Sequence, residues 1–123
     1  MVNPEKRILG YYTLSAYSIR VDELPPELTK KLPKHPLLPA TLLGRLAVSQ
    51  AYRGQKLGSL FLMDALHRSW KHTKEFASIG VVAEAIDEAA RLFYLHHEFV
   101  SFSEHRSKLF ISMKTIEGAF KNP

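Results

Sequence analysis

The sequence contains no cysteine among its 123 residues, which excludes disulfide bonds, cysteine nucleophiles and thiolate metal sites together. It also has no apolar run near the roughly 18 residues that a membrane-spanning helix requires. The segment MVNPEKRILGYY places charges and a proline where a signal peptide would need an apolar stretch. From these absences we expect a cytoplasmic protein with no membrane contact.

Several well-known catalytic and phosphate-binding motifs are absent as well. The chain has neither a G-x-x-x-x-G-K-S/T P-loop nor a G-x-G-x-x-G dinucleotide fingerprint. It lacks the G-x-S-x-G turn that carries the serine of many hydrolases. Its six histidines fit no H-E-x-x-H or facial-triad spacing, so we expect no metal site.

The composition is that of one globular domain spanning residues 1–123, with 46% hydrophobic and 24% charged residues. The net charge of +5 admits an anionic partner, either nucleic acid, a phosphate-bearing cofactor or an acidic protein. Basic side chains gather at two places, Lys30, Lys31, Lys34 and His35, and Arg68, Lys71, His72 and Lys74. These clusters are either ordinary solvated surface or surface that steers an RNA.

The hydrophobic pattern predicts five strands, at residues 7–19, 40–49, 77–86, 99–103 and 108–116. It predicts helices over 57–75 and 88–97, the second capped by Asp87. A proline-rich loop at 22–39 contains a short helical turn after Pro26. This order predicts an α+β fold with α/β-like crossovers, in which a mixed central sheet is flanked by helices.

The segment RGQKLG, residues 53–58, lies between a strand and a helix. A helix N-terminus exposes unpaired N–H groups, and glycines allow a phosphate to approach them closely. Arg53 and Lys56 would add charge to such a site. The residues alone leave two interpretations open, a phosphate site or an ordinary tight turn.

The stretch LGRLAVSQAYRGQKLGSLFLMDAL resembles motif A of the GNAT superfamily of acetyl-CoA-dependent N-acetyltransferases, whose pattern is R/Q-x-x-G-x-G/A. The stretch DEAARLFYLHHEF is similar to motif B of the same superfamily. With GYYTLSA and the proline loop, they resemble the acetyltransferase toxins of bacterial toxin–antitoxin pairs, over about residues 7–115. The resemblance implies the GNAT fold and acetyl-CoA as co-substrate.

The resemblance also implies roles for particular residues. The backbone of Leu46, Ala47 and Val48 would pair with the pantetheine arm of the coenzyme. The pyrophosphate would be held by the loop formed by Arg53, Gly54, Gln55, Lys56, Leu57, Gly58 and Ser59. Tyr94 would protonate the departing thiolate, which suits a phenol with an ordinary pKa of about 10. The alternative for Tyr94 is a packing role, and Asp87 is either a helix cap or a base toward the acceptor.

Three features depart from the family pattern. Lys56 stands at the middle glycine of motif A, and Glu98 stands at the glycine that normally ends the motif B helix. Relatives carry further strands and helices before GYYTLSA, so we expect an N-terminally truncated domain. The edge strand at residues 7–19 would then be exposed and would pair with a second copy in a homodimer.

Two classes of function are compatible with these features of the sequence. The first is an N-acetyltransferase that acts on a primary amine, with the amino group of an aminoacyl-tRNA as the toxin-like acceptor and a ribbon-helix-helix antitoxin as partner. The second is a catalytically inactive remnant of the fold that serves as a binding or assembly module. RNA binding without a cofactor is a third interpretation, but the sequence shows no aromatic stacking motif for it.

Overall fold

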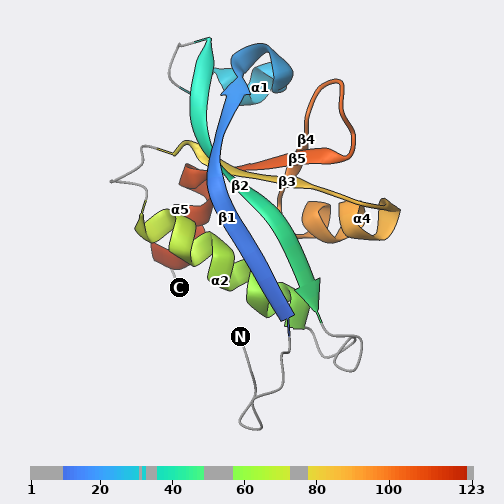
Figure 1. Ribbon diagram of the computed structural model, residues 1–123. Coiled ribbons are helices and arrows are strands. Elements are labelled where there is room, and N and C mark those ends of the chain that lie inside the picture. The colour runs from blue at the N-terminus through green and yellow to red at the C-terminus, as the bar shows by residue number, and fades with distance from the viewer. Residues whose placement is uncertain (1–9, 31, 33–35, 49–56, 73–77, 122–123) are drawn as a thin grey trace, which may run out of the picture.

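The computed structural model of the chain describes residues 10–30, 32, 36–48, 57–72 and 78–121, which form a five-stranded sheet with helices (Figure 1). The strands are β1 (Gly10–Arg20), β2 (Leu37–Val48), β3 (Gly80–Glu84), β4 (Val100–Ser101) and β5 (Lys108–Ser112). The helices are η1 (Val21–Glu23), α1 (Pro26–Thr29), α2 (Leu57–Lys71), α4 (Glu88–His96) and α5 (Met113–Lys121). None of these helices is long and apolar enough to cross a membrane.

The sheet is mixed, with the strand order β1-β2-β3-β5-β4. β2 and β3 are parallel neighbours, and α2 lies between them in the chain. The other neighbouring pairs are antiparallel. This is the crossover arrangement that the alternation of strand and helix patterns predicts.

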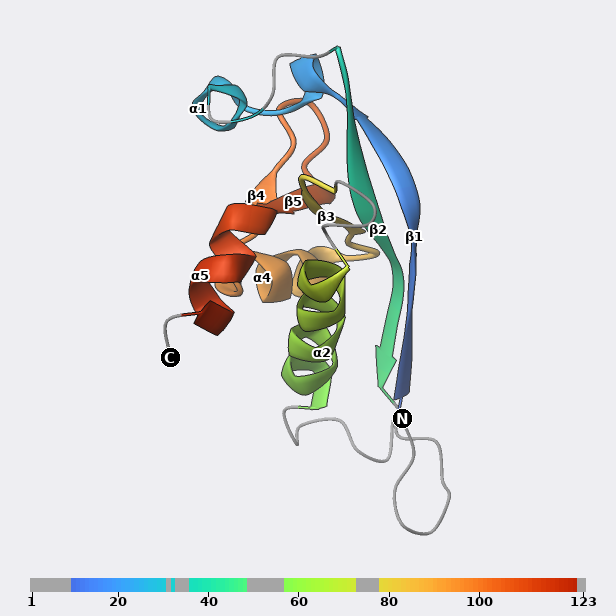
Figure 2. The same ribbon diagram turned by 90° about the vertical axis from the view of Figure 1, so that its left-hand side faces the viewer.

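The helices α2, α4 and α5 lie on one side of the sheet (Figure 2). Their apolar residues form one core cluster with the strands, including Leu62, Tyr94 and Ile116. β3 is buried on both faces, because Val81 and Ala83 belong to that cluster while Val82 belongs to a second cluster on the opposite face. Two layers of apolar contacts therefore fix β3 in the middle of the sheet.

The sequence predicted most of these elements. The strands at the N-terminal half, the turn of helix after Pro26 and the starts of α2 and α4 are confirmed, although β2 begins at Leu37, inside the predicted loop. The prediction of a last strand over 108–116 is wrong, since the strand ends at Ser112 and α5 follows. The N–H of Thr115 donates a hydrogen bond to Ser112 Oγ at 3.1 Å, which caps the first turn of α5.

Candidate functional site

One edge of β2 pairs with no described strand over the last residues of β2. β2 pairs with β1 as far as Val48, but its parallel pairing with β3 covers only Thr41–Leu43 opposite Val81–Ala83. Over residues 44–48, no described strand pairs with the β3 side of β2. Backbone N–H and C=O groups require partners, so this edge can bind an extended amide-bearing ligand. Leu46, Ala47 and Val48, the residues expected to hold the pantetheine arm, lie in this segment.

A β-bulge at Gly44 marks the point where the parallel pairing stops. Thr13 pairs with Arg45 and Leu14 pairs with Leu43, so Gly44 has no partner of its own in β1. A Cβ atom at Gly44 would lie 2.7 Å from Thr13 Oγ1, closer than real Cβ contacts allow. A bulge bends its strand and increases the local twist, and beyond it β2 and β3 diverge (Figure 1). The bulge therefore contributes to the opening between the two strands.

The N-terminus of α2 lies at the same end of the sheet as the end of β2 in both views of the ribbon (Figures 1 and 2). Leu57, Gly58 and Ser59 form its first turn, which contains no acidic residue. The first N–H groups of a helix lack partners within the helix and carry a partial positive charge. The remaining predicted phosphate-loop residues, Arg53, Gly54, Gln55 and Lys56, lie outside the described residues.

Tyr94 projects from α4 into the core and is only 6% exposed. Its ring lies between Phe93 and Phe99, at centroid distances of 5.4 and 5.1 Å. Burial raises the pKa of the Tyr94 phenol above its ordinary value of 10.0. The phenol therefore holds its proton at neutral pH and is available as a proton donor.

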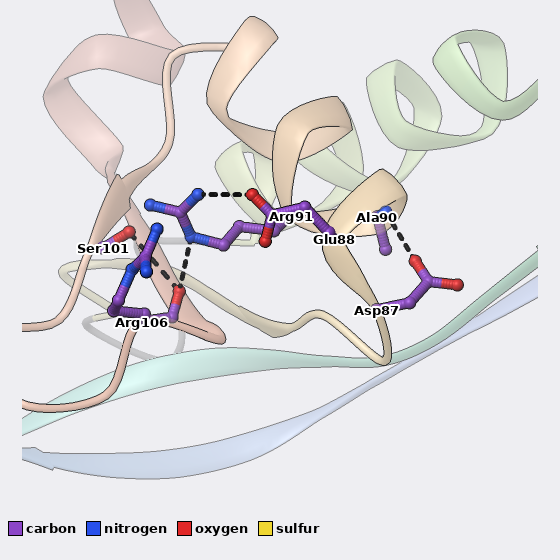
Figure 3. A network of polar contacts seen from close by, with 6 residues as sticks. All are labelled: Asp87, Glu88, Ala90, Arg91, Ser101 and Arg106. Carbon is purple, nitrogen blue, oxygen red and sulfur yellow. Dashed lines mark hydrogen bonds and ion pairs between the residues drawn. The ribbon is translucent and has the colours of Figure 1, made fainter.

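The start of α4 is fixed by Asp87, which adopts extended backbone angles and accepts a hydrogen bond from the N–H of Ala90 at 2.8 Å (Figure 3). This contact confirms the predicted capping role of Asp87. One turn further on, Arg91 Nε donates to the carbonyl oxygen of Arg106 at 3.1 Å, and Arg91 also pairs with Glu88 at 3.0 Å (Figure 3). The basic turn between β4 and β5 is thus tied to the helix that carries Tyr94.

The end of α4 is a Schellman turn. The N–H of Phe99 donates to the carbonyl of Tyr94, and the N–H of Glu98 donates to the carbonyl of Leu95, both at 3.1 Å. Glu98 has a φ of 71°, the left-handed conformation that favours glycine. Glu98, which stands where the family pattern has glycine, is therefore strained, because its backbone adopts a conformation that favours glycine.

His97 was not among the site residues that the sequence indicated. Its Nε2 lies 3.0 Å from Ser59 Oγ, so the residue after α4 is hydrogen-bonded to the first turn of α2. Burial, and then the neighbouring His96, lower the pKa of the His97 imidazole below 6.5. The sequence contains no signal for this contact, because Ser59 and His97 are 38 positions apart and belong to different elements.

The structure thus joins the start of α2 to the end of α4, and both helices lie on one side of the sheet that contains the opening beside β2. Tyr94 precedes His97 by one helical turn, and Ser59 lies across the hydrogen bond. Within the described part of the chain, no group of three or more His, Asp or Glu side chains is placed to hold a metal ion. The arrangement can hold an extended anionic ligand and supply one phenolic proton, which suits acyl transfer without a metal.

No protein-family model matches this chain, but the chain is similar to several known proteins. The tRNA-acetylating toxin of Mycobacterium tuberculosis (strain ATCC 25618 / H37Rv) is 31% identical over 93 residues, which cover 76% of this chain. The matched region is 55% of that toxin, so the chain spans about half the length of this curated relative.

Two of the similar structures are complexes of AtaT. AtaT complexed with acetyl-methionyl-tRNA is 32% identical, with a TM-score of 0.85, and the match covers 96% of this chain and 70% of AtaT. A Tyr-to-Phe variant of AtaT, bound to the C-terminus of the antitoxin AtaR and acetyl-CoA, is 26% identical. Its TM-score is 0.78, and the match covers 97% of this chain and 69% of that chain.

Proposed function

Because this chain belongs to the family of acetyltransferase toxins with the GNAT fold, we propose that it transfers the acetyl group of acetyl-CoA to the amino group of an aminoacyl-tRNA. The observation that carries the proposal is the edge of β2 at residues 44–48, which pairs with no strand among the described residues. It lies on the sheet that α2 and the Tyr94 helix cover, and the Ser59–His97 contact joins these helices. An extended coenzyme fits this combination of a strand edge, a helix N-terminus and a phenol.

In this proposal the coenzyme lies along β2. The amides of its pantetheine arm pair with the backbone of Leu46, Ala47 and Val48, and its pyrophosphate meets the N-terminus of α2 at Leu57, Gly58 and Ser59. Arg53, Gly54, Gln55 and Lys56 complete the phosphate loop. The acetyl-CoA found with AtaT supports acetyl-CoA as the co-substrate.

The proposed chemistry requires one proton donor and one oxyanion site. The acceptor nitrogen attacks the thioester carbonyl and forms the new C–N bond, and N–H groups on the free edge of β2 stabilise the oxyanion. The C–S bond then breaks, and the departing thiolate takes the proton of Tyr94. The nitrogen loses its extra proton to water, and solvent returns a proton to the phenolate. The raised pKa of Tyr94 keeps the phenol protonated until the thiolate forms.

The tRNA and the antitoxin fragment bound to AtaT support two macromolecular partners for this chain, an aminoacyl-tRNA and an antitoxin of the ribbon-helix-helix class. Both partners belong to the cytoplasm, where we place this protein. The net charge of +5 favours binding of an RNA by long-range attraction.

A homodimer through the N-terminal strand is the second part of the proposal. β1 ends the sheet, so one of its edges pairs with no described strand. A cavity of about 340 Å³ is lined by Tyr11 and Tyr12 at the start of β1 and by Asp64 and Arg68 of α2, among others. The Tyr12 hydroxyl donates to the Asp64 carboxylate, and Arg68 lies 3.6 Å from the same carboxylate. A long free edge of this kind favours pairing with the same edge of a second copy.

Calorimetric titration with acetyl-CoA tests the coenzyme site, on the unchanged chain and on Lys56→Gly. The proposal predicts micromolar binding by the unchanged chain. If only Lys56→Gly binds, the lysine has disabled the site, and the chain is an inactive remnant that serves as a binding or assembly module. Absence of binding by both proteins would overturn the coenzyme site itself.

A further inference from the structure

We propose that His97 is a positioning residue of the phosphate site, which donates a hydrogen bond to Ser59 and so leaves the hydroxyl proton of Ser59 free for the coenzyme pyrophosphate. The inference rests on the proposed function, because it assumes that acetyl-CoA binds at the N-terminus of α2. It assigns a role to a residue for which the motifs of the sequence provide none.

The contact between the two side chains is direct. Ser59 Oγ and His97 Nε2 lie 3.0 Å apart, and both residues are partly buried. Ser59 is the third residue of α2, in the turn whose N–H groups lack partners within the helix. His97 directly follows α4, the helix that carries Tyr94, and its ring contacts the first turn of α2.

A hydroxyl has a single proton, and this decides what the contact can do. If Nε2 carries no proton, Ser59 must donate to the ring, and the hydroxyl then presents only lone pairs to a phosphate. If Nε2 carries the proton, His97 donates to Ser59, and the hydroxyl proton is directed to the ligand. A phosphate oxygen accepts hydrogen bonds only, so the bound coenzyme selects the second arrangement.

The backbone and the neighbouring rings hold the imidazole of His97 in place. The N–H of His97 donates to the carbonyl of Tyr94 at 3.0 Å, and its ring meets the ring of Phe93 edge-on at 4.8 Å. The same carbonyl of Tyr94 also accepts a hydrogen bond from the N–H of Phe99, which completes the turn at Glu98. The turn that ends the Tyr94 helix therefore also fixes the donor to Ser59.

The surroundings of the ring keep it neutral, so that the ligand selects between its tautomers. A cavity of about 250 Å³ beside the ring is lined by His96 and Glu98 as its other titratable groups. The elements packed against it contribute apolar groups there, such as Met63 of α2 and Ile116 of α5. Burial and His96 lower the pKa of the His97 imidazole, which agrees with a neutral donor.

The test measures binding of two probes to the full chain and to four variants. Acetyl-CoA carries the pyrophosphate, whereas acetyl-pantetheine carries the same arm and thioester without it. We expect Ser59→Ala to weaken acetyl-CoA binding by about tenfold, the effect of one hydrogen bond to a charged group. We expect His97→Phe to weaken it by a similar factor, because the Ser59 hydroxyl then lacks the donor that orients its proton toward the ligand. Acetyl-pantetheine binding should change less than twofold in both variants.

Two controls separate positioning from a general structural role. His97→Gln retains an N–H that can reach Ser59, and we expect it to restore most of the acetyl-CoA affinity. The double variant Ser59→Ala/His97→Phe should bind no more weakly than either single variant, because the two residues act through one proton.

Three results would overturn the inference. They are equal weakening of both probes by His97→Phe, unchanged acetyl-CoA affinity in that variant, and additive losses in the double variant. If the unchanged chain binds no acetyl-CoA, the proposed function fails, and this inference fails with it. If the unchanged chain binds acetyl-CoA and His97→Phe binds it equally well, only the inference about His97 fails.

Discussion

The backbone N–H of Phe99 donates a hydrogen bond to the carbonyl of Tyr94 at 3.1 Å, and the rings of these two residues lie 5.1 Å apart. The hydrogen bond ends the helix α4, and the ring contact packs Tyr94, the proposed proton donor, against Phe99. It also requires Glu98, which lies between them, to adopt a φ of 71°. The site is therefore built around a residue in a costly conformation.

Glu98→Gly should stabilise the protein by about 1 kcal/mol. A non-glycine residue in the left-handed conformation costs roughly 1–2 kcal/mol, and the greater freedom of glycine in the unfolded chain offsets part of the gain. Denaturant unfolding of the two proteins measures the difference. Glu98→Ala is the matched control, since it removes the carboxylate but retains Cβ, and it should gain only a few tenths of a kcal/mol. Equal stability of the Gly and Ala variants would contradict the assignment of backbone strain.

Asp87→Ala should destabilise the protein by about 1 kcal/mol, because the N–H of Ala90 loses its acceptor at the start of α4. Asp87→Asn retains an acceptor oxygen and should keep most of the stability. It should also keep the rate of acetyl transfer, since capping does not require a base. A large loss of turnover in Asp87→Asn, with stability preserved, would identify Asp87 as a base instead.

The imidazole of His97 should make the folded protein less stable at mildly acidic pH. Its pKa is lowered in the folded state, so the unfolded chain binds the proton more readily at this residue. The contribution is fully present above the unfolded pKa of 6.5 and is lost as the pH falls through the lower folded value. Melting temperatures between about pH 7 and pH 5 should therefore fall less steeply in His97→Gln than in the unchanged chain. If the melting temperatures of the two proteins fall equally steeply with pH, the assignment of a partly buried, neutral His97 is contradicted.

The outer edge of β1, which pairs with no strand in the described part of the chain, should support a dimer that an added charge disrupts. Tyr11 is 48% exposed on this strand, and Ser15 is exposed as well. Lysine on an edge strand opposes pairing with another edge, so the Tyr11→Lys/Ser15→Lys variant should sediment as a monomer with an unchanged fold. Ser103→Lys adds the same charge at an exposed residue outside β1 and should remain dimeric. Monomeric behaviour of the unchanged chain in analytical ultracentrifugation would rule out this interface.

The fold could be predicted from the sequence where local patterns and backbone chemistry agree. The apolar stretch of β3, the start of α2 and the cap at Asp87 each have a signal within a few residues. The last helix was missed because KLFISMKTI continues the apolar pattern of a strand. Its switch to a helix depends on the cap at Ser112 and on the burial of Ile116 in the core.

The site was predictable only in part, because some of its features depend on contacts between distant segments. Gly44 is an ordinary glycine in the sequence, and its bulge emerges only from the register between β1 and β2. The Ser59–His97 contact depends on how α2 and α4 pack on the same face of the sheet. Glu98 was recognised as unusual because it replaces a glycine, and its positive φ gives the physical reason.

Acetyl transfer is tested directly by measuring the movement of labelled acetyl from acetyl-CoA to purified aminoacyl-tRNA, with the unchanged chain and with Tyr94→Phe. The proposed mechanism predicts acetylated aminoacyl-tRNA from the unchanged chain. It predicts a rate about 100-fold lower in Tyr94→Phe with similar acetyl-CoA affinity, since the variant lacks only the phenolic proton. Equal rates in the two proteins would remove Tyr94 from the mechanism. An unchanged chain that binds acetyl-CoA and aminoacyl-tRNA but transfers no acetyl group would contradict the proposed activity.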